Sequence, residues 1–384
     1  MSKRVTLNDV ATCAGVSYQT VSRVINDSTL VSRAVRARVR EAMHELDYLP
    51  SAAARNLAGG RSMLLAVLIS DVYNPFWGAI LRGIEDVAYD GGYSMITCNI
   101  GIYDGEREAT YVRVLREHRV AGVIIAGTTL AQTDRQLLAQ LDMEVVSVDE
   151  RRVGMDSVLL DNVAAADLAV EHLLHIGHRR IGLITGPTVS ASGRGRLVGY
   201  RRALRRAGIP LDRSLQAINP FSQEAAAEST RRMLSRADRP SALIAASNDL
   251  TIGAMRAAAS SGLRIPDDVA LVGFDELTWT SALLSPITTV AQPGRALGNT
   301  ACRLLLERLG GRYTGPPRRL LLAPRLIVSL SSGAMAAQPQ DGLQTISEGT
   351  YLLHPLEPLT GVKPQVESTG STSQRKEETQ ISTV

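Results

Sequence analysis

Residues 6 to 25 constrain the fold of this chain most strongly, because they carry the pattern of two short helices joined by a tight turn. In the first helix, apolar residues recur at the 3.6-residue period and form one stripe, made of Leu7, Val10, Ala11 and Ala14. Gly15 then allows the left-handed backbone that a sharp turn needs. Thr6 and Ser17 each precede a helix and can cap its free amides with a side-chain oxygen. The inward face of the second helix is expected to consist of Val21, Val24 and Ile25.

The outward face of the second helix carries side chains that are suited to reading DNA, namely Tyr18, Gln19, Ser22 and Arg23. Glutamine can form two hydrogen bonds with the N6/N7 edge of adenine, and arginine can do the same with the O6/N7 edge of guanine. A helix that presents such groups near its N-terminus fits the recognition helix of a helix-turn-helix. The alternative is an ordinary helical hairpin with a polar outer face. The glycine at the turn and the restriction of these side chains to the second helix favour DNA binding.

Two stretches of the chain, Val5–Ala11 and Gly15–Val24, resemble the headpiece of the lac repressor (LacI/GalR) family. The resemblance extends from about residue 4 to about residue 330. It implies a sequence-specific DNA-binding transcriptional regulator, in most cases a repressor, and not an enzyme. We expect the contacts with double-stranded operator DNA to come from Thr6, Leu7, Ser17, Tyr18, Gln19, Thr20, Ser22, Arg23, Asn26, Arg33, Asn56 and Leu57.

A third helix is expected from about residue 33 to residue 46, which completes a DNA-binding domain over residues 1–49. Its inward residues are Val35, Val39, Met43 and Leu46, and its arginines can touch phosphates. Residues 1–60 hold eight Lys and Arg against five Asp and Glu, so +3 of the net charge of +4 lies in this part of the chain. Such a basic end module suits a phosphate backbone. The alternative, for Arg36 and Arg40 taken alone, is a solvated helix face.

Residues 50–60 predict a helix of about eight residues, which begins at Pro50 and ends at Gly59–Gly60. A helix this short is marginal in water, so a flexible linker is the alternative. The family resemblance implies a hinge helix that folds only on operator DNA, with one copy from each subunit in the minor groove. Leu57 matches the apolar wedge that such a helix inserts between base steps.

From residue 61 to residue 332 the pattern changes to alternating apolar strands and helices. Strands of a first unit are expected at 64–69, 93–98, 120–126 and 145–148, with a helix at 134–141. A crossing segment near 157–160 leads to a second unit, with strands expected at 180–184, 217–218, 243–246 and 269–273. Both the segment 287–290 and the helix 295–309 are expected to return toward the first unit. The predicted fold is a periplasmic-binding-protein-like clamshell of two doubly wound parallel-sheet subdomains, with its cleft at the carboxyl ends of the strands.

Polar residues follow the ends of four predicted strands and can bond the hydroxyls of a sugar: Asp71, Asp149, Asn248 and Asp275. The resemblance implies that Arg196 donates hydrogen bonds to ligand oxygens. Phe76 and Phe221 can supply flat walls, and Gln292 a further polar contact. The alternative for each aspartate is a helix N-cap, which we favour for Asp249.

The sequence offers no convincing metal or catalytic site. His172 and His175 can share a helix face, but Gly177 ends that helix before His178, and no carboxylate-rich partner is near. Three widely spaced cysteines make neither a disulfide framework nor a metal motif: Cys13, Cys98 and Cys302. Neither a phosphate-binding Gly-Lys-Ser/Thr loop nor a Gly-x-Ser-x-Gly elbow is present. We therefore expect no metal, cofactor or catalytic residue.

The remaining features bear on location and assembly. No run of eighteen apolar residues and no apolar segment after Met1 occur, so we expect a cytoplasmic protein with neither a membrane span nor an export signal. Residues 333–384 are rich in Ser, Thr, Gln, Glu, Gly and Pro, which predicts a disordered tail. This tail lacks leucine heptads, so a homodimer is favoured over a tetramer.

These observations predict a repressor whose operator binding is controlled by a small effector, with a sugar as the favoured class. Effector binding would close or twist the clamshell, change the spacing of the amino-terminal subdomains in the dimer and alter hinge folding. One alternative is a regulator that needs its effector as a co-repressor, with a purine-type or sugar-phosphate ligand. The other is a clamshell ligand receptor, which the intact headpiece argues against.

Overall fold

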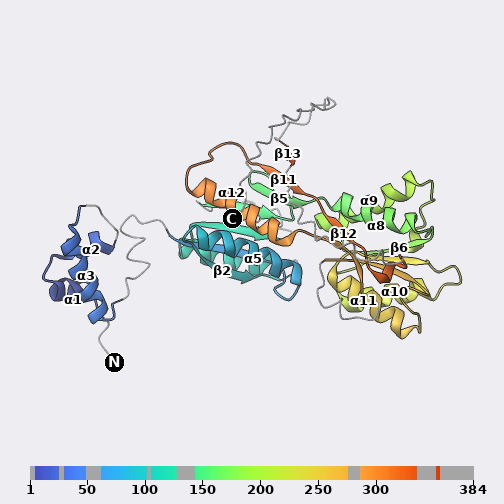
Figure 1. The fold of residues 1–384 in the computed structure, drawn as a ribbon, viewed down its shortest axis with the longest axis horizontal. Helices are drawn as coiled ribbons and strands as arrows, with labels where there is room; N and C mark the ends of the chain where they lie inside the picture. Colours follow the sequence, from blue (N-terminus) through green and yellow to red (C-terminus); the bar gives the residue numbers. More distant parts are fainter. Residues whose placement is uncertain are drawn as a thin grey trace, which may run out of the picture.

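The computed structural model describes residues 5–25, 30–48, 62–101, 105–127, 143–275, 286–334 and 352–354. In these ranges the chain forms a helical headpiece and an α/β core with two sheets (Figure 1). The predicted hinge helix at 50–60 with Asn56 and Leu57, the predicted contact Asn26 and the predicted helix at 134–141 lie outside the described residues. No helix in the described ranges is long and apolar enough to cross a membrane.

The headpiece has the three predicted helices: α1 (Leu7–Ala14), α2 (Tyr18–Ile25) and α3 (Arg33–Glu45). Thr6 caps α1 in a reciprocal arrangement, because its backbone N–H donates to Asp9 Oδ2 at 2.8 Å while its Oγ1 accepts from the Asp9 N–H. Gly15 ends α1 in the left-handed region at φ 61°, as the turn requires. Arg38 of α3 donates to the carbonyl oxygens of Ala14 and Gly15, at 2.7 and 3.1 Å, and so ties α3 to this turn.

The first sheet has the strand order β13-β11-β5-β4-β3-β1-β2. The strands are β1 (Leu64–Ile69), β2 (Ser94–Asn99), β3 (Gly122–Ala126), β4 (Glu144–Val148), β5 (Asp156–Leu160), β11 (Arg319–Leu322) and β13 (Leu352–His354). All neighbours are parallel except β13, which runs antiparallel to β11. Its helices are α5 (Pro75–Asp90), α6 (Gly105–Glu117) and α12 (Gly294–Leu309). The order reverses at β1 and β3, which marks the carboxyl ends of these strands as the place for a ligand.

Helices α5 and α12 lie side by side over the first sheet (Figure 1). Glycines permit this close approach, since a Cβ added at Gly83 would lie 2.1 Å from the carbonyl oxygen of Arg295. A Cβ at Gly298 would lie 2.1 Å from the carbonyl oxygen of Ile80. The two helices therefore pack backbone against backbone.

The second sheet has the strand order β12-β10-β9-β8-β6-β7. Its strands are β6 (Ile181–Thr185), β7 (Gln216–Ile218), β8 (Ala242–Ala245), β9 (Ala270–Phe274), β10 (Thr288–Ala291) and β12 (Arg325–Ile327). Its helices are α8 (Asn162–His175), α9 (Ala191–Arg206), α10 (Gln223–Leu234) and α11 (Asn248–Ser260). Helix α8 pairs with α9, and α10 pairs with α11. Each pair covers its own apolar cluster, which makes the doubly wound arrangement that the sequence predicts.

Two segments take places that the sequence analysis did not predict. Residues 157–160, expected to be a crossing segment, form β5 inside the first sheet between β4 and β11. Residues 287–290, expected to return to the first unit, instead contribute β10, which pairs with β9 in the second sheet. Helix α12 does return to the first unit, where it packs on α5. A short apolar strand suits either sheet equally well, and only long-range pairing decides between them.

The predicted tail contains one element that pattern analysis missed. Leu352–His354 form β13, which adds an antiparallel strand to the outer edge of β11. The rest of the tail beyond residue 334 lies outside the described residues.

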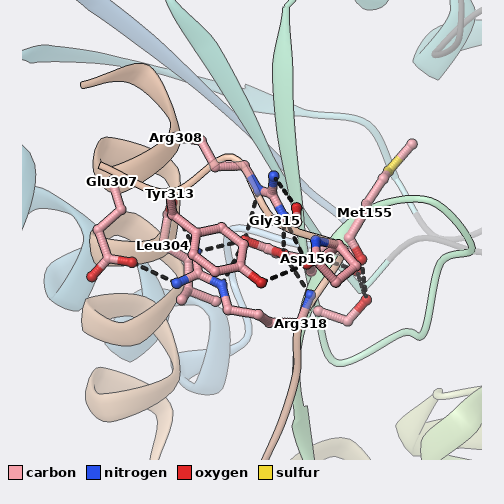
Figure 2. A network of polar contacts seen from close by, with 11 residues as sticks. Met155, Asp156, Leu304, Glu307, Arg308, Tyr313, Gly315 and Arg318 are labelled. Carbon is pink, nitrogen blue, oxygen red and sulfur yellow. Dashed lines mark hydrogen bonds and ion pairs between the residues drawn. The ribbon is translucent and has the colours of Figure 1, made fainter. Parts of the chain in front are cut away.

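A buried network of ion pairs and hydrogen bonds surrounds Asp156 at the start of β5 (Figure 2). The fully buried Asp156 carboxylate, at the start of β5, accepts from Arg308 Nη2 at 2.6 Å and Arg308 Nε at 2.9 Å. It also accepts from Arg318 Nη2 at 2.8 Å, and Arg318 lies 3.8 Å from the ring of Tyr313. Burial opposes ionisation of Asp156, but the hydrogen bonds from the two arginines outweigh it and lower the pKa of its carboxyl.

Candidate functional site

The predicted readout residues lie on the solvent-facing side of α2. Tyr18, Gln19 and Arg23 are exposed, whereas Val21 and Val24 are buried in the headpiece core. The remaining predicted contacts on this helix, Thr20 and Ser22, are half-buried. The structure thus brings base-reading side chains to one open face, with the apolar face of α2 fixed against α1 and α3.

The other described headpiece contacts flank this face. Ser17 precedes α2, where its Oγ accepts from the Thr20 N–H at 3.2 Å. Thr6 is exposed at the start of α1, and Arg33 is exposed at the start of α3. Leu7 is half-buried, and its side chain packs against the headpiece core. The guanidinium of Arg33 suits a phosphate group.

A cavity lies between the two subdomains. Seven of the eight predicted effector residues line it: Asp71, Phe76, Asp149, Arg196, Phe221, Asp275 and Gln292. They come from both sheets, since Asp71 follows β1 and Asp149 follows β4, whereas Asp275 follows β9. The carboxyl ends of parallel strands therefore meet at this cavity, as predicted.

Arg196 of α9 is buried at the floor of this cavity and is held from several sides. Its Nε donates to Asn162 Oδ1 and its Nη2 donates to Gln292 Oε1, both at 2.9 Å. Its Nη1 donates to the carbonyl oxygen of Ala246, and the guanidinium lies 4.5 Å from the ring of Phe274. A guanidinium fixed in this way presents a preorganised donor to a ligand oxygen.

Asp275 connects β9 to the start of α11. Its backbone adopts φ 76°, and its carboxylate accepts from the Asn248 backbone N–H at 2.9 Å and from Gln292 Nε2. Burial raises the pKa of Asp275, and the charge of Arg196 opposes this rise. Asp275, Gln292 and Arg196 thus form a continuous polar chain in the wall of the cavity.

The start of α11 differs from the prediction at two positions. The Asn248 side chain does not line the cavity, and its Oδ1 is buried with no hydrogen-bond partner among the described residues. Ser247, rather than Asp249, caps the helix by accepting from the Leu250 N–H. Asp249 instead lines the cavity and accepts from Gln223 Nε2 at 3.1 Å. The packing of α11 against the second sheet sets the rotation of the helix about its axis. That rotation decides whether Asn248 or Asp249 faces the cleft.

Two consecutive carboxylates after β4 also line the cavity. Asp149 is buried at φ 67°, and its Oδ1 has no hydrogen-bond partner among the described residues. Burial raises the pKa of Asp149, with Arg196 opposing the rise. Glu150 accepts from the backbone N–H of Ala191 at 2.6 Å and so joins the first subdomain to the start of α9. Burial is the main cause that raises the pKa of Glu150 to about 7.

Aromatic rings supply flat surfaces to the cavity. Phe76 and Trp77, at the start of α5, lie edge to face with ring centroids 4.8 Å apart. Trp77 covers Gly127, where an added Cβ would lie 2.0 Å from the indole ring. Phe221 covers Gly186 in the second subdomain in the same way. Both predicted aromatic walls therefore lie at the cavity, and Trp77 extends one of them.

Sequence reasoning missed several lining residues: Ser70, Asn74, Trp77, Gly127, Glu150, Ser190, Ser192, Ser247 and Asp249. Most of them follow a predicted strand directly or begin the next helix. The same strand-end signal that pointed to Asp71 and Asp149 could have found Ser70 and Glu150.

The histidines around α8 have structural partners. His172 Nε2 lies 2.9 Å from Ser332 Oγ, and His178 Nδ1 lies 2.9 Å from Ser241 Oγ. Within the described ranges, no group of three His, Cys, Asp or Glu side chains is arranged to hold a metal ion.

Comparisons with known proteins agree with this architecture. Residues 6–51 match the description "Bacterial regulatory proteins, lacI family", and residues 170–332 match a periplasmic binding protein-like domain. The ribose operon repressor of Escherichia coli (strain K12) is 34% identical over 84% of this chain and 98% of its own length. The lac repressor dimer bound to operator and the anti-inducer ONPF superimposes with a TM-score of 0.77, at 33% identity over 86% of this chain and 99% of that one. The complex of the transcriptional regulator CelR with cellobiose gives a TM-score of 0.65, at 33% identity over 85% of this chain and 100% of that one.

Proposed function

Because the chain belongs to the lacI family of bacterial regulatory proteins, we propose that it is a repressor whose affinity for operator DNA is controlled by a sugar in the interdomain cleft. Membership in this family makes it a DNA-binding transcriptional regulator and confirms the resemblance noted in the sequence. Its relatives are regulators rather than enzymes, and we propose no catalytic role for the cleft. Such a regulator acts on chromosomal DNA in the cytoplasm.

The DNA contacts of this proposal are those of the exposed face of α2. Gln19 and Arg23 are the base-reading side chains, and the surrounding hydroxyls and Arg33 meet the phosphates. The lac repressor dimer was solved on its operator, which supports a homodimer that places two headpieces on a pseudo-palindromic site. We assign residues 1–49 to the DNA-binding domain, 50–60 to the hinge and 61–332 to the effector-binding and dimerisation core, with 333–384 as a tail.

The observation that carries the effector proposal is the polar chain of Arg196, Gln292 and Asp275 at the carboxyl ends of the strands. It offers donors and acceptors side by side, which is what the vicinal hydroxyls of a sugar require. Phe76, Trp77 and Phe221 offer rings against which the apolar face of a sugar can lie. Ribose and cellobiose are named with two of the relatives, which supports a carbohydrate.

Coupling of the two sites requires that the ligand bind one arrangement of the subdomains better than another. The described chain crosses between the subdomains at 160–162, 291–294 and 322–325, so the two halves can rotate about a common set of short links. A coupling free energy of about 1 to 3 kcal/mol would change operator affinity by roughly 5- to 150-fold.

The test begins with an operator selected by the full-length protein from random duplex DNA. Fluorescence anisotropy then measures operator affinity with and without a panel of sugars and purines. Weaker operator binding with a sugar supports the proposal. Stronger binding with a purine or a sugar phosphate supports the co-repressor alternative instead, and failure to enrich any operator would overturn the proposal.

A further inference from the structure

We infer that the cleft selects an uncharged, hydroxyl-rich ligand and rejects the phosphorylated or carboxylated counterparts of that ligand. The inference rests on the proposed sugar control and narrows the chemical class of the effector. Three observations carry it: the charge of the lining, the occupied helix N-termini and one buried acceptor atom without a partner.

Among the described residues that line the cavity, acids outnumber bases. Five acids face it, and Arg196 is the one Lys or Arg among these lining residues. The acids are Asp71, Asp149, Glu150, Asp249 and Asp275. The guanidinium of Arg196 already donates to Asn162, Gln292 and Ala246 and is flanked by the charges of Asp149 and Asp275. Burial raises the pKa of Asp149, of Asp275 and of Glu150, the last to about 7, so an anionic ligand group would meet these three carboxyls in a partly ionised state. Because the site is partly buried, their negative charge is weakly screened and repels such a group.

Helix N-termini, which usually attract phosphate, are already occupied here. Glu150 accepts from the first amide of α9, at Ala191, and Ser190 accepts from the third amide at 3.0 Å. At the start of α11, Asp275 accepts from the first amide and Ser247 accepts from the third. The protein's own carboxylates and hydroxyls thus fill the positions that an anion would take.

The start of α5 is closed to an anion in a similar way. Its first residue is Pro75, which has no N–H, and Asn74 Oδ1 accepts from the Phe76 N–H at 3.0 Å. The leading amide is therefore missing in α5 and hydrogen-bonded to a protein carboxylate in α9 and α11.

Asp149 supplies the evidence for what the cleft accepts. Its side chain is more than nine-tenths buried and lines the cavity, and its Oδ1 has no hydrogen-bond partner among the described residues. A buried acceptor without a donor is costly, and a ligand hydroxyl would satisfy it. A phosphate or carboxylate group placed against this oxygen is largely deprotonated near neutral pH and cannot donate to it, whereas a hydroxyl at the same position can.

The test uses matched ligand pairs with the full-length protein at pH 7.5. Isothermal titration calorimetry compares D-ribose with D-ribose 5-phosphate, and D-glucose with D-glucose 6-phosphate and D-gluconate; cellobiose serves as a further neutral ligand. We expect a neutral sugar to bind, and its anionic counterpart to bind at least about 100-fold more weakly, as expected for like charges placed side by side. Equal or tighter binding of an anionic member overturns the inference and leaves sugar control intact. If no member binds, the proposed sugar effector fails, and the inference fails with it.

A charge-removing variant tests the cause. Glu150→Gln combined with Asp249→Asn keeps hydrogen-bonding oxygens at both positions but removes two ionisable carboxyls. We expect the preference for the neutral member to shrink at least about tenfold in this variant. The matched control is Glu228→Gln, which removes one exposed charge on α10 outside the cavity and should leave the preference unchanged. An unchanged preference in the cavity variant, with its melting temperature retained, would overturn the electrostatic explanation.

Discussion

Glu150 accepts a hydrogen bond from the backbone N–H of Ala191 at 2.6 Å, and this contact joins the end of β4 to the start of α9 across the cleft. The two residues belong to different subdomains, so the contact exists only while the halves of the clamshell lie together. Because the carboxyl is largely buried there, its protonation is linked to the same arrangement.

Because protonation of Glu150 is linked to folding, the free energy of unfolding should depend on pH, and Glu150→Gln should remove this dependence. The pKa of Glu150 is raised from 4.5 to about 7, so this group favours the native arrangement below pH 4.5 and loses that contribution as pH rises to 7. The loss amounts to at most about 3 kcal/mol. Denaturant unfolding between pH 5 and 8 should show native stability falling with pH relative to that of the variant. Parallel profiles for the two proteins would mean that Glu150 is solvated in solution.

The network around Asp156 predicts a second, opposite pH effect. Asp156→Asn removes the anion to which Arg308 donates and leaves Arg318 with Glu307 alone, and it should lower the free energy of unfolding by about 3 to 5 kcal/mol. The pKa of Asp156 is lowered, so its contribution is complete above pH 4 and disappears as pH falls through the native pKa. The control is Asp238→Asn, which breaks exposed ion pairs worth less than about 1 kcal/mol. Similar losses for both variants in urea unfolding would contradict the role assigned to the network.

Readout by α2 predicts a loss of specificity rather than a loss of all DNA binding. Gln19→Ala and Arg23→Ala should each weaken binding to the selected operator by about 1 to 3 kcal/mol, because each removes a two-point contact with a base. Weak, salt-sensitive binding to unrelated duplexes should persist, since phosphate contacts remain. Competition anisotropy with operator and scrambled DNA measures both. The charge-matched control is Arg213→Ala, which removes an exposed arginine of the α/β domain, outside the headpiece. Full operator preference in the α2 variants would show that other residues read the bases.

The packing of α5 against α12 predicts opposite effects for two glycines of one helix. At Gly83 an added methyl group would lie 2.1 Å from the carbonyl oxygen of Arg295, so Gly83→Ala should destabilise the core by about 2 kcal/mol or more. At Gly78 nothing lies within 4 Å, so Gly78→Ala should be neutral or stabilise by about 0.5 to 1 kcal/mol. Thermal melts of the two variants measure the difference. Equal melting temperatures would rule out the close helix contact.

Several features follow from the sequence because their physics is local. Thr6 and Ser17 act on amides within three residues, and Gly15 acts through its own φ angle, so the headpiece could be predicted helix by helix. The effector residues were also largely predictable, since parallel strands bring their carboxyl ends to one edge. That rule identified Asp71, Asp149 and Asp275 without any knowledge of their neighbours.

Tertiary structure decided the features that depend on distant partners or on helix rotation. Asn248 was predicted to line the cavity, but Asp249 lines it instead, because of the way α11 is rotated about its axis. The periodicity of a single helix does not specify this rotation. Glu150 and Ala191 are 41 residues apart, and Asp156 and Arg308 are 152 apart, so neither pair leaves a local pattern. The assignment of β5 and β10 to their sheets has the same origin. A short apolar strand gains similar burial beside many neighbours, and the complete set of long-range contacts selects the pairing.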